Sequence, residues 1–140
     1  MIEGKAAQVA NGQMMGAVSG HERILVVDDE QDVADVVSIG LDRLGYEVAT
    51  VQDPAEAVEI FKEDPNAWDV VISDQVMPGM RGLEVLAAMK CLRPSVRFIL
   101  CTGFSDGATE RMALDAGAAA FFVKPVLPEQ LAAAVRRLIG

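Results

Sequence analysis

The sequence predicts an α/β protein in which five strands form a doubly wound parallel sheet with helices on both faces. From Arg23 onward, short and continuously apolar runs alternate with longer amphipathic stretches. Alternating strands and helices are typical of a parallel sheet, and strands buried on both faces have unbroken apolar runs. Four of the five apolar runs also lead directly into a residue that can bind a phosphate or a divalent metal.

The predicted strands are rich in Val, Ile, Leu and Phe, and Gly, Pro or charged residues bound them. The first strand has no polar alternation, which indicates a central position in the sheet. The predicted ranges are Arg23–Val27, Tyr46–Val51, Trp68–Ser73, Val96–Cys101 and Ala120–Val123.

A helix is predicted after each strand from apolar residues at three- and four-residue spacing. Gly45 and Gly117 are expected to end the first and fourth helices, and Asp53 to cap the second, with Pro54 at its first position. The predicted ranges are Gln31–Leu44, residues 54–64, Leu83–Leu92, Gly107–Ala116 and Leu127–Ile139. The residues expected to form the apolar faces of the first and last helices are Val33, Val36, Val37, Leu41 and Leu44, and Leu127, Leu131, Val135 and Leu138.

Composition limits the classes of function. The 140 residues, 51% of them hydrophobic, are enough for one domain, which we place at residues 23–140 after a flexible tail or linker at residues 1–22. A net charge of −9 argues against direct binding to nucleic acid or to an anionic membrane surface. No apolar stretch approaches the roughly 20 residues of a membrane-spanning helix, and the N-terminus lacks a secretory signal, so we expect a cytoplasmic protein.

The residues at the strand ends predict a shared site. Asp28 and Asp29 follow the first strand, Asp74 the third, Thr102 the fourth and Lys124 the fifth. Ligands of open α/β sheets bind at the edge formed by the carboxyl ends of the strands. Three carboxylates crowded there would repel one another, and Mg²⁺, which takes oxygen ligands, would relieve that repulsion. The pattern therefore favours metal-dependent phosphoryl transfer.

Five motifs link this pattern to a known family. They are Asp28-Asp29, Asp74, Met77-Pro78-Gly79, Thr102-Gly103 and Lys124-Pro125. In their order and spacing they resemble the receiver domain of two-component response regulators, over essentially all of residues 23–140. The resemblance implies a flavodoxin-like (βα)₅ fold with strand order 2-1-3-4-5.

The resemblance also implies roles at the acidic cluster. Asp74 would be the nucleophile that attacks the phosphorus of a phosphohistidine and forms an aspartyl phosphate. Asp28, Asp29 and Asp74 would bind Mg²⁺, together with the backbone carbonyl of Val76. Val76 and Phe104 would flank the acceptor and the threonine with apolar side chains, from which we expect slow loss of the phosphoryl group.

The remaining strand-end residues would act on the transferred group. Lys124 would pair first with Asp74 and then with the phosphoryl oxygens, and Thr102 would turn its hydroxyl onto them. In the family, this movement opens space for an aromatic residue, which here is Phe121, so Thr102 and Phe121 would form the switch. The peptide bond between Lys124 and Pro125 is expected to be cis, as in the family.

The resemblance implies partners and excludes enzymatic turnover of other substrates. The phosphoryl donor would be a histidine kinase or a histidine phosphotransfer protein, and the chain would catalyse only its own phosphorylation and dephosphorylation. A downstream protein or a second copy would bind through the last two helices. The phrase Cys101 to Asp106 resembles the ends of hybrid histidine kinases. We expect no output domain after the last helix, and a single-domain regulator, the C-terminal receiver of a hybrid kinase and an excised receiver all stay open.

Two other classes of function stay open. One is an interaction module that has the receiver fold and binds partners without phosphorylation. The other is a magnesium-dependent phosphatase with an aspartate nucleophile. Such enzymes carry a second Asp two residues after the nucleophile, and that position is Val76 in this chain.

Overall fold

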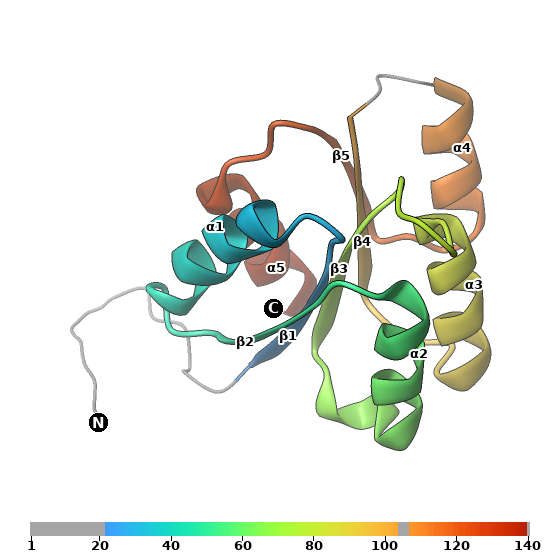
Figure 1. Cartoon of the computed structure of the whole chain (residues 1–140), viewed down its shortest axis with the longest axis horizontal. Coiled ribbons are helices and arrows are strands. Elements are labelled where there is room, and N and C mark those ends of the chain that lie inside the picture. Colours follow the sequence, from blue (N-terminus) through green and yellow to red (C-terminus); the bar gives the residue numbers. More distant parts are fainter. Residues whose placement is uncertain (1–21, 104–106, 140) are drawn as a thin grey trace.

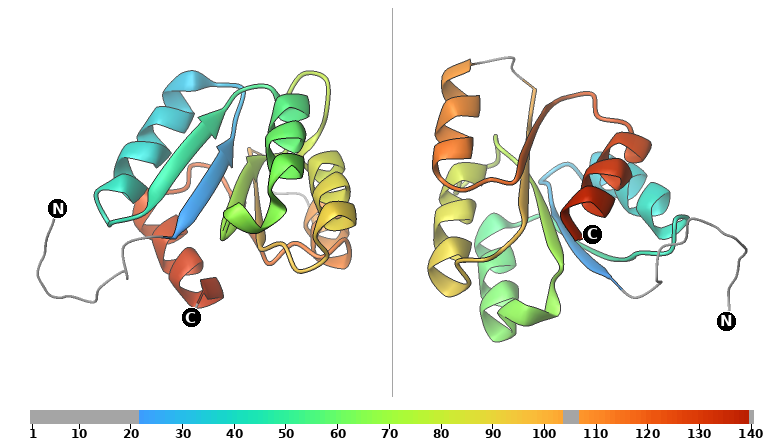
Figure 2. Two further views of the ribbon diagram at one scale, coloured as in Figure 1. Left: turned by 90° about the horizontal axis from the view of Figure 1, so that it is seen from below. Right: turned by 180° about the vertical axis from the view of Figure 1, so that it is seen from behind.

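The protein is a three-layer α/β sandwich in a computed structural model that describes residues 22–103 and 107–139 (Figure 1). Helices α1 (Gln31–Asp42) and α5 (Pro128–Ile139) cover one face of the sheet. Helices α2 (Pro54–Glu63), α3 (Gly82–Leu92) and α4 (Gly107–Asp115) cover the other, as both views in Figure 2 show. The predicted doubly wound α/β fold is therefore confirmed.

The five strands are all parallel and follow the order β2-β1-β3-β4-β5. Their bounds are β1 (Arg23–Val27), β2 (Glu47–Val51), β3 (Val70–Asp74), β4 (Phe98–Thr102) and β5 (Ala120–Val123). The chain winds outward to β2 and then returns across β1 to β3. The carboxyl ends of β1 and β3 therefore flank the point where the winding reverses, which is the usual place for a ligand in such sheets.

Side chains alternate between two cores along the inner strands. In β1, Leu25 and Val27 pack with α2, α3 and α4, whereas Ile24 and Val26 pack with α1 and α5. All four are nearly inaccessible to solvent. Burial on both faces is the reason why these strands have unbroken apolar runs instead of alternating patterns.

Five strand boundaries differ from the predicted ones, and two of the differences concern the site. Asp74 and Thr102 were predicted to follow strands, but they are the last residues of β3 and β4. The reason is that backbone pairing continues to this edge: the N–H of Gln75 donates to the Cys101 carbonyl at 2.8 Å, and that of Lys124 to the Thr102 carbonyl at 2.7 Å. At the opposite edge, β2, β3 and β4 begin at residues 47, 70 and 98, one or two residues later than predicted.

The segment before β3 contains a turn that the sequence did not predict. Pro65–Ala67 forms a short 3₁₀ helix, η1, after α2. The guanidinium of Arg93 donates to the carbonyls of Pro65 and Trp68, at 3.1 and 2.7 Å. The Trp68 carbonyl is therefore bonded to a side chain, and the first residue of β3 that is paired with β1 is Val70, opposite Ile24.

The apolar faces predicted for the first and last helices were too wide. Val36 is exposed within α1, and Leu44 is exposed just after the helix ends. Leu127, which precedes α5, is exposed as well. Helix α1 buries a narrower stripe that includes Ala34 and Leu41, since β1, β2 and α5 cover only that side.

Helix α1 also ends at Asp42, two residues before the predicted end. The chain turns through Gly45, whose φ of 101° lies in the left-handed region that favours glycine. Gly117 has a φ of 98° just beyond α4. The predicted roles of both glycines as helix terminators are therefore confirmed.

The predicted tail falls almost entirely outside the described part of the chain, which begins at Glu22. The Glu22 carbonyl accepts a hydrogen bond from the Glu47 N–H at 3.0 Å, at the start of the β1–β2 pair. Among residues 22–103 and 107–139, no helix is both long enough and apolar enough to cross a membrane.

Candidate functional site

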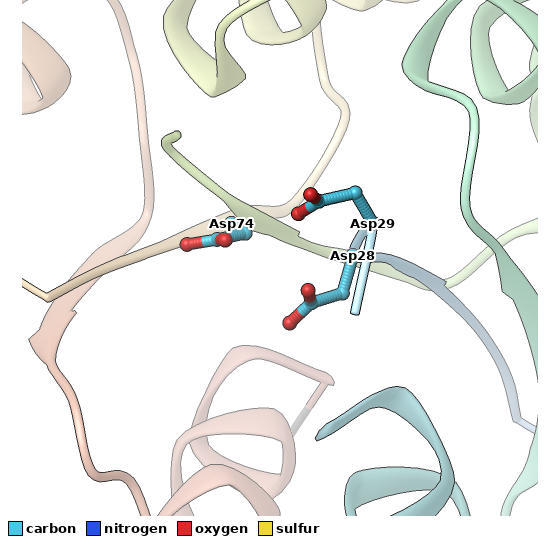
Figure 3. A group of neighbouring side chains, drawn as sticks. All are labelled: Asp28, Asp29 and Asp74. Carbon is cyan, nitrogen blue, oxygen red and sulfur yellow. The ribbon is translucent and has the colours of Figure 1, made fainter. Parts of the chain in front are cut away.

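Three carboxylates lie together at the carboxyl edge of the sheet (Figure 3). Strands β1 and β3 are neighbours, with Val27 paired to Ser73, so Asp28 and Asp74 follow side by side. Each of Asp28, Asp29 and Asp74 offers an oxygen within 4.8 Å of the other two. Asp28 and Asp74 are buried, whereas Asp29 is exposed. An oxygen-only cluster that is partly open to solvent suits a hard cation such as Mg²⁺.

Lys124 reaches this cluster from the far edge of the sheet. Its Nζ lies 3.3 Å from Asp74 Oδ1 and 3.3 Å from Asp28 Oδ2. The predicted pairing with Asp74 is confirmed, and the pairing with Asp28 is additional. The ammonium group therefore bridges the two buried carboxylates. The Lys124–Pro125 bond is cis, as predicted.

Thr102 ends β4, between the strand that carries Asp74 and the strand that leads to Lys124. Asp74 pairs with Cys101 and Thr102 pairs with Val123, so Thr102 lies at the same sheet edge as the cluster. Its side chain is buried. The four predicted strand ends therefore meet in one site, as the parallel arrangement requires.

The remaining predicted site residues lie around this centre. Val76 follows β3 in a loop, and its side chain is 58% exposed. Phe121 lies on β5, is half-buried, and packs against the core beneath α2, α3 and α4. The metal-binding role of the Val76 carbonyl and the switch role of Phe121 stay predictions. Phe104 lies outside the described residues.

Burial shifts the ionisation of the two central groups. Burial, and then the neighbouring charge of Asp28, raise the pKa of Asp74 above its usual range, against the opposing effect of Lys124. Burial alone would lower the pKa of Lys124, but the Asp28 and Asp74 carboxylates outweigh it and leave that pKa raised. The ammonium is therefore held in its charged form, and ionised Asp74 is a source of instability.

We expect Asp74→Asn to stabilise the metal-free protein at pH 7. Because the pKa of Asp74 is raised on folding, the folded state binds this proton more tightly, and stability falls as the pH rises through that pKa. Asn keeps the shape of the side chain and removes the charge. Thermal unfolding in the presence of a chelator should show a Tm about 3 °C higher than that of the wild type, which corresponds to roughly 1 kcal/mol.

The same comparison at acidic pH is the control. Below the ordinary aspartate pKa of about 4, Asp74 is protonated in both the folded and the unfolded state, so Asn and Asp then differ little and the gap in Tm should close. An Asp74→Asn protein that is equally stable or less stable at pH 7 would show that Lys124 fully offsets the cost of burying this charge.

One contributor to the site was missed at the sequence level. Gln75 is buried, its backbone N–H donates to Asp74 Oδ1 at 2.9 Å, and its side chain contacts the start of α3. The only signal in the sequence was a polar residue directly after a strand-end carboxylate, and many loops have such a residue.

Comparisons with known proteins agree with this geometry. A sequence profile described as the response regulator receiver domain matches residues 24–136. The response regulator MprA of a Mycobacterium species is 36% identical over 118 residues, which are 84% of this chain and 50% of that protein. The probable transcriptional regulator ycf27 of Cyanophora paradoxa is 35% identical over 119 residues, 84% of this chain and 48% of that protein. The chain thus spans about half the length of these curated relatives.

Solved structures show the same fold. A response regulator receiver domain protein from Clostridium thermocellum superposes with a TM-score of 0.81 at 34% identity, covering 84% of this chain and 94% of that one. A response regulator protein from Burkholderia pseudomallei is described with a phosphorylated aspartic acid, a calcium ion and citrate. It superposes with a TM-score of 0.75 at 28% identity, covering 81% of this chain and 66% of that one. The fold and site define a flavodoxin-like signalling domain of the two-component class. The chain belongs to the response regulator receiver domain family.

Proposed function

We propose that this chain takes a phosphoryl group from a phosphohistidine onto Asp74 in a magnesium-dependent reaction and thereby switches a protein-interaction face. The observation that carries the proposal is the position of Lys124, whose Nζ lies 3.3 Å from both Asp28 and Asp74. A fixed positive charge beside the nucleophile is what the spread charge of a phosphoryl transition state requires.

The step is an in-line exchange of one bond for another. A carboxylate oxygen of Asp74 attacks the phosphorus, the new O–P bond forms, the P–N bond to the donor imidazole breaks, and the imidazole leaves with the electron pair. Lys124 then pairs with the phosphoryl oxygens, and the Thr102 hydroxyl donates to them. A magnesium ion held by Asp28, Asp29, Asp74 and the Val76 carbonyl would neutralise the crowded carboxylates and the incoming phosphoryl oxygens. The chain acts on itself alone and turns over no other substrate.

Several observations support the choice of donor and metal. Receiver domains interact with histidine kinases, and a histidine phosphotransfer protein presents the same phosphohistidine. The Burkholderia pseudomallei relative carries a phosphorylated aspartic acid together with a divalent cation. We propose a cytoplasmic location for the chain together with these donors. The net charge of −9 favours a protein partner over direct contact with nucleic acid or an anionic membrane.

The test is the intact mass after incubation with acetyl phosphate and Mg²⁺. The wild type should gain one labile phosphoryl group, and neither Asp74→Ala nor the wild type with a chelator should gain any. If the wild type gains none from acetyl phosphate or from a histidine-phosphorylated donor, the proposal is wrong. A phosphorylation-independent interaction module would then be favoured.

Phe121 is the proposed link between the phosphoryl group and the interaction face of α4, β5 and α5. It packs on the α4 side of the sheet, whereas Phe122 packs on the α1 and α5 side. When the Thr102 hydroxyl turns towards the phosphoryl group, Phe121 would move into the space it leaves. We expect Phe121→Ala to abolish the change in amide hydrogen exchange of α4 that acetyl phosphate induces. Phe122→Ala is the matched control, and an unaltered response in Phe121→Ala would exclude this switch.

A further inference from the structure

The first two N–H groups of helix α3, those of Gly82 and Leu83, have no acceptor in the residue just before the helix. The first N–H groups of a helix have no partner within the helix, and an acceptor in the residue just before it usually supplies one. That residue is Arg81, whose guanidinium has donors only and makes no capping hydrogen bond. The Arg81 carbonyl accepts from the Glu84 N–H at 2.9 Å, but the acceptors for the Gly82 and Leu83 N–H groups must come from elsewhere.

Gln75 supplies them from the loop that follows the phosphoacceptor strand. Its backbone carbonyl accepts from the Gly82 N–H at 2.9 Å, and its side-chain Oε1 accepts from the Leu83 N–H at 2.9 Å. Gln75 is 7% exposed, so water does not readily replace these contacts. The first two N–H groups of α3 are thus satisfied by a single residue that lies outside the helix, in the loop next to Asp74.

The same residue holds the phosphoacceptor. The Gln75 N–H donates to Asp74 Oδ1 at 2.9 Å and to the Cys101 carbonyl at 2.8 Å. On the other side, the Ser73 hydroxyl donates to the Asp74 carbonyl at 2.9 Å. The helix approaches so closely that a Cβ at Gly82 would overlap the Asp74 carbonyl oxygen. The end of β3 and the start of α3 are therefore joined as one rigid unit.

We propose that Gln75 is a positioning residue for phosphoryl transfer: by capping α3 from the position next to Asp74, it fixes the acceptor carboxylate and the carbonyl of Val76. This inference rests on the proposed function, because it assigns Gln75 to the same reaction. Val76 directly follows Gln75 in the chain, so its backbone carbonyl is the one next to the Gln75 carbonyl that accepts from α3. A shift of the Gln75 side chain would therefore displace the metal ligand and the nucleophile together.

The test compares three variants with the wild type in the full chain. Gln75→Met has a similar length and removes the acceptor for Leu83, whereas Gln75→Glu keeps an acceptor oxygen. Glu84→Ala is the matched control, since it removes a different hydrogen bond at the start of the same helix, from the Arg81 N–H to Glu84 Oε1 at 2.8 Å. The readouts are the Kd for Mg²⁺ by titration calorimetry, the rate of phosphorylation by acetyl phosphate, and Tm. All are measured at about 0.15 M salt, because salt screens the charge that Glu84→Ala removes.

We expect Gln75→Met to weaken Mg²⁺ binding by about tenfold, as is common when a residue behind a metal ligand is lost, and to slow phosphorylation in parallel. Gln75→Glu should bind Mg²⁺ at least as well as the wild type, and Glu84→Ala should lower Tm with little change in Kd or rate. If Gln75→Met and Glu84→Ala change Kd and rate equally, or if Gln75→Met leaves both unchanged, Gln75 has a structural role only. If the wild type is not phosphorylated at all, the proposed function fails instead, which the mass measurement on the wild type shows separately.

Discussion

Lys124→Met is expected to slow the phosphorylation of Asp74 by at least about a hundredfold and, at the same time, to tighten Mg²⁺ binding. The rate falls because the ammonium of Lys124, 3.3 Å from both Asp28 and Asp74, is the positive charge that the chain itself supplies to the phosphoryl oxygens, in addition to that of the magnesium ion. The metal binds more tightly because the same ammonium competes with a cation for those carboxylates. Opposite changes in rate and metal affinity would separate this role from a general loss of structure.

The measurements are a time course of intact mass with acetyl phosphate at saturating Mg²⁺ and a calorimetric titration with Mg²⁺. Lys90→Met is the matched control, since Lys90 lies on α3 and donates to the Pro94 carbonyl. Lys124→Arg keeps the charge and should retain part of the rate. A Lys124→Met protein that is phosphorylated at the wild-type rate would remove the main support for the proposed chemistry.

Gly82→Ala is expected to destabilise the protein by about 1–3 kcal/mol and to slow phosphorylation. The added Cβ would meet the Asp74 carbonyl oxygen, a methyl group of Leu100 and the Cα of Gln75. Two of these three atoms are backbone atoms of the phosphoacceptor segment, which cannot move without disturbing the carboxylate. The start of α3 would therefore be pushed away from the end of β3.

Gly107→Ala is the matched control, because it makes the same chemical change at the first residue of another helix. A Cβ at Gly107 would have no neighbour within 4 Å, and Ala is favourable in a helix, so this variant should be as stable as the wild type or slightly more stable. Urea unfolding of both variants measures the difference. Equal stability of the two would mean that α3 can shift freely, and the joint between α3 and Asp74 would then be loose.

One physical reason explains why both the fold class and the positions of the site residues could be predicted from the sequence. A parallel strand covered by helices on both faces must be apolar along its whole length, so the five runs were visible without any alignment. The carboxyl ends of such strands all meet at one edge, which brought Asp28, Asp74, Thr102 and Lys124 into one predicted site. The structure confirms that all four lie at that edge.

Helix boundaries and helix faces were less predictable. Periodicity shows that a helix has an apolar side, but the width of the buried stripe depends on the neighbouring elements. Val36 and Leu127 fit the predicted faces and are nevertheless exposed. Strand ends were also hard to predict, because they depend on neighbouring elements. Asp74 and Thr102 belong to strands only because the hydrogen bonding to a neighbouring strand continues past them.

The sequence by itself therefore determined the doubly wound α/β class, the glycines that end two helices, and the residue types available at the site. The tertiary structure alone decided the contacts among these residues, such as the bridge from Lys124 to Asp28 and the capping of α3 by Gln75. The physical reason is that burial patterns are local properties of a chain, and each segment carries its own. A hydrogen bond or an ion pair between different elements depends on which strands are neighbours and how closely a helix approaches them, and no single element encodes that.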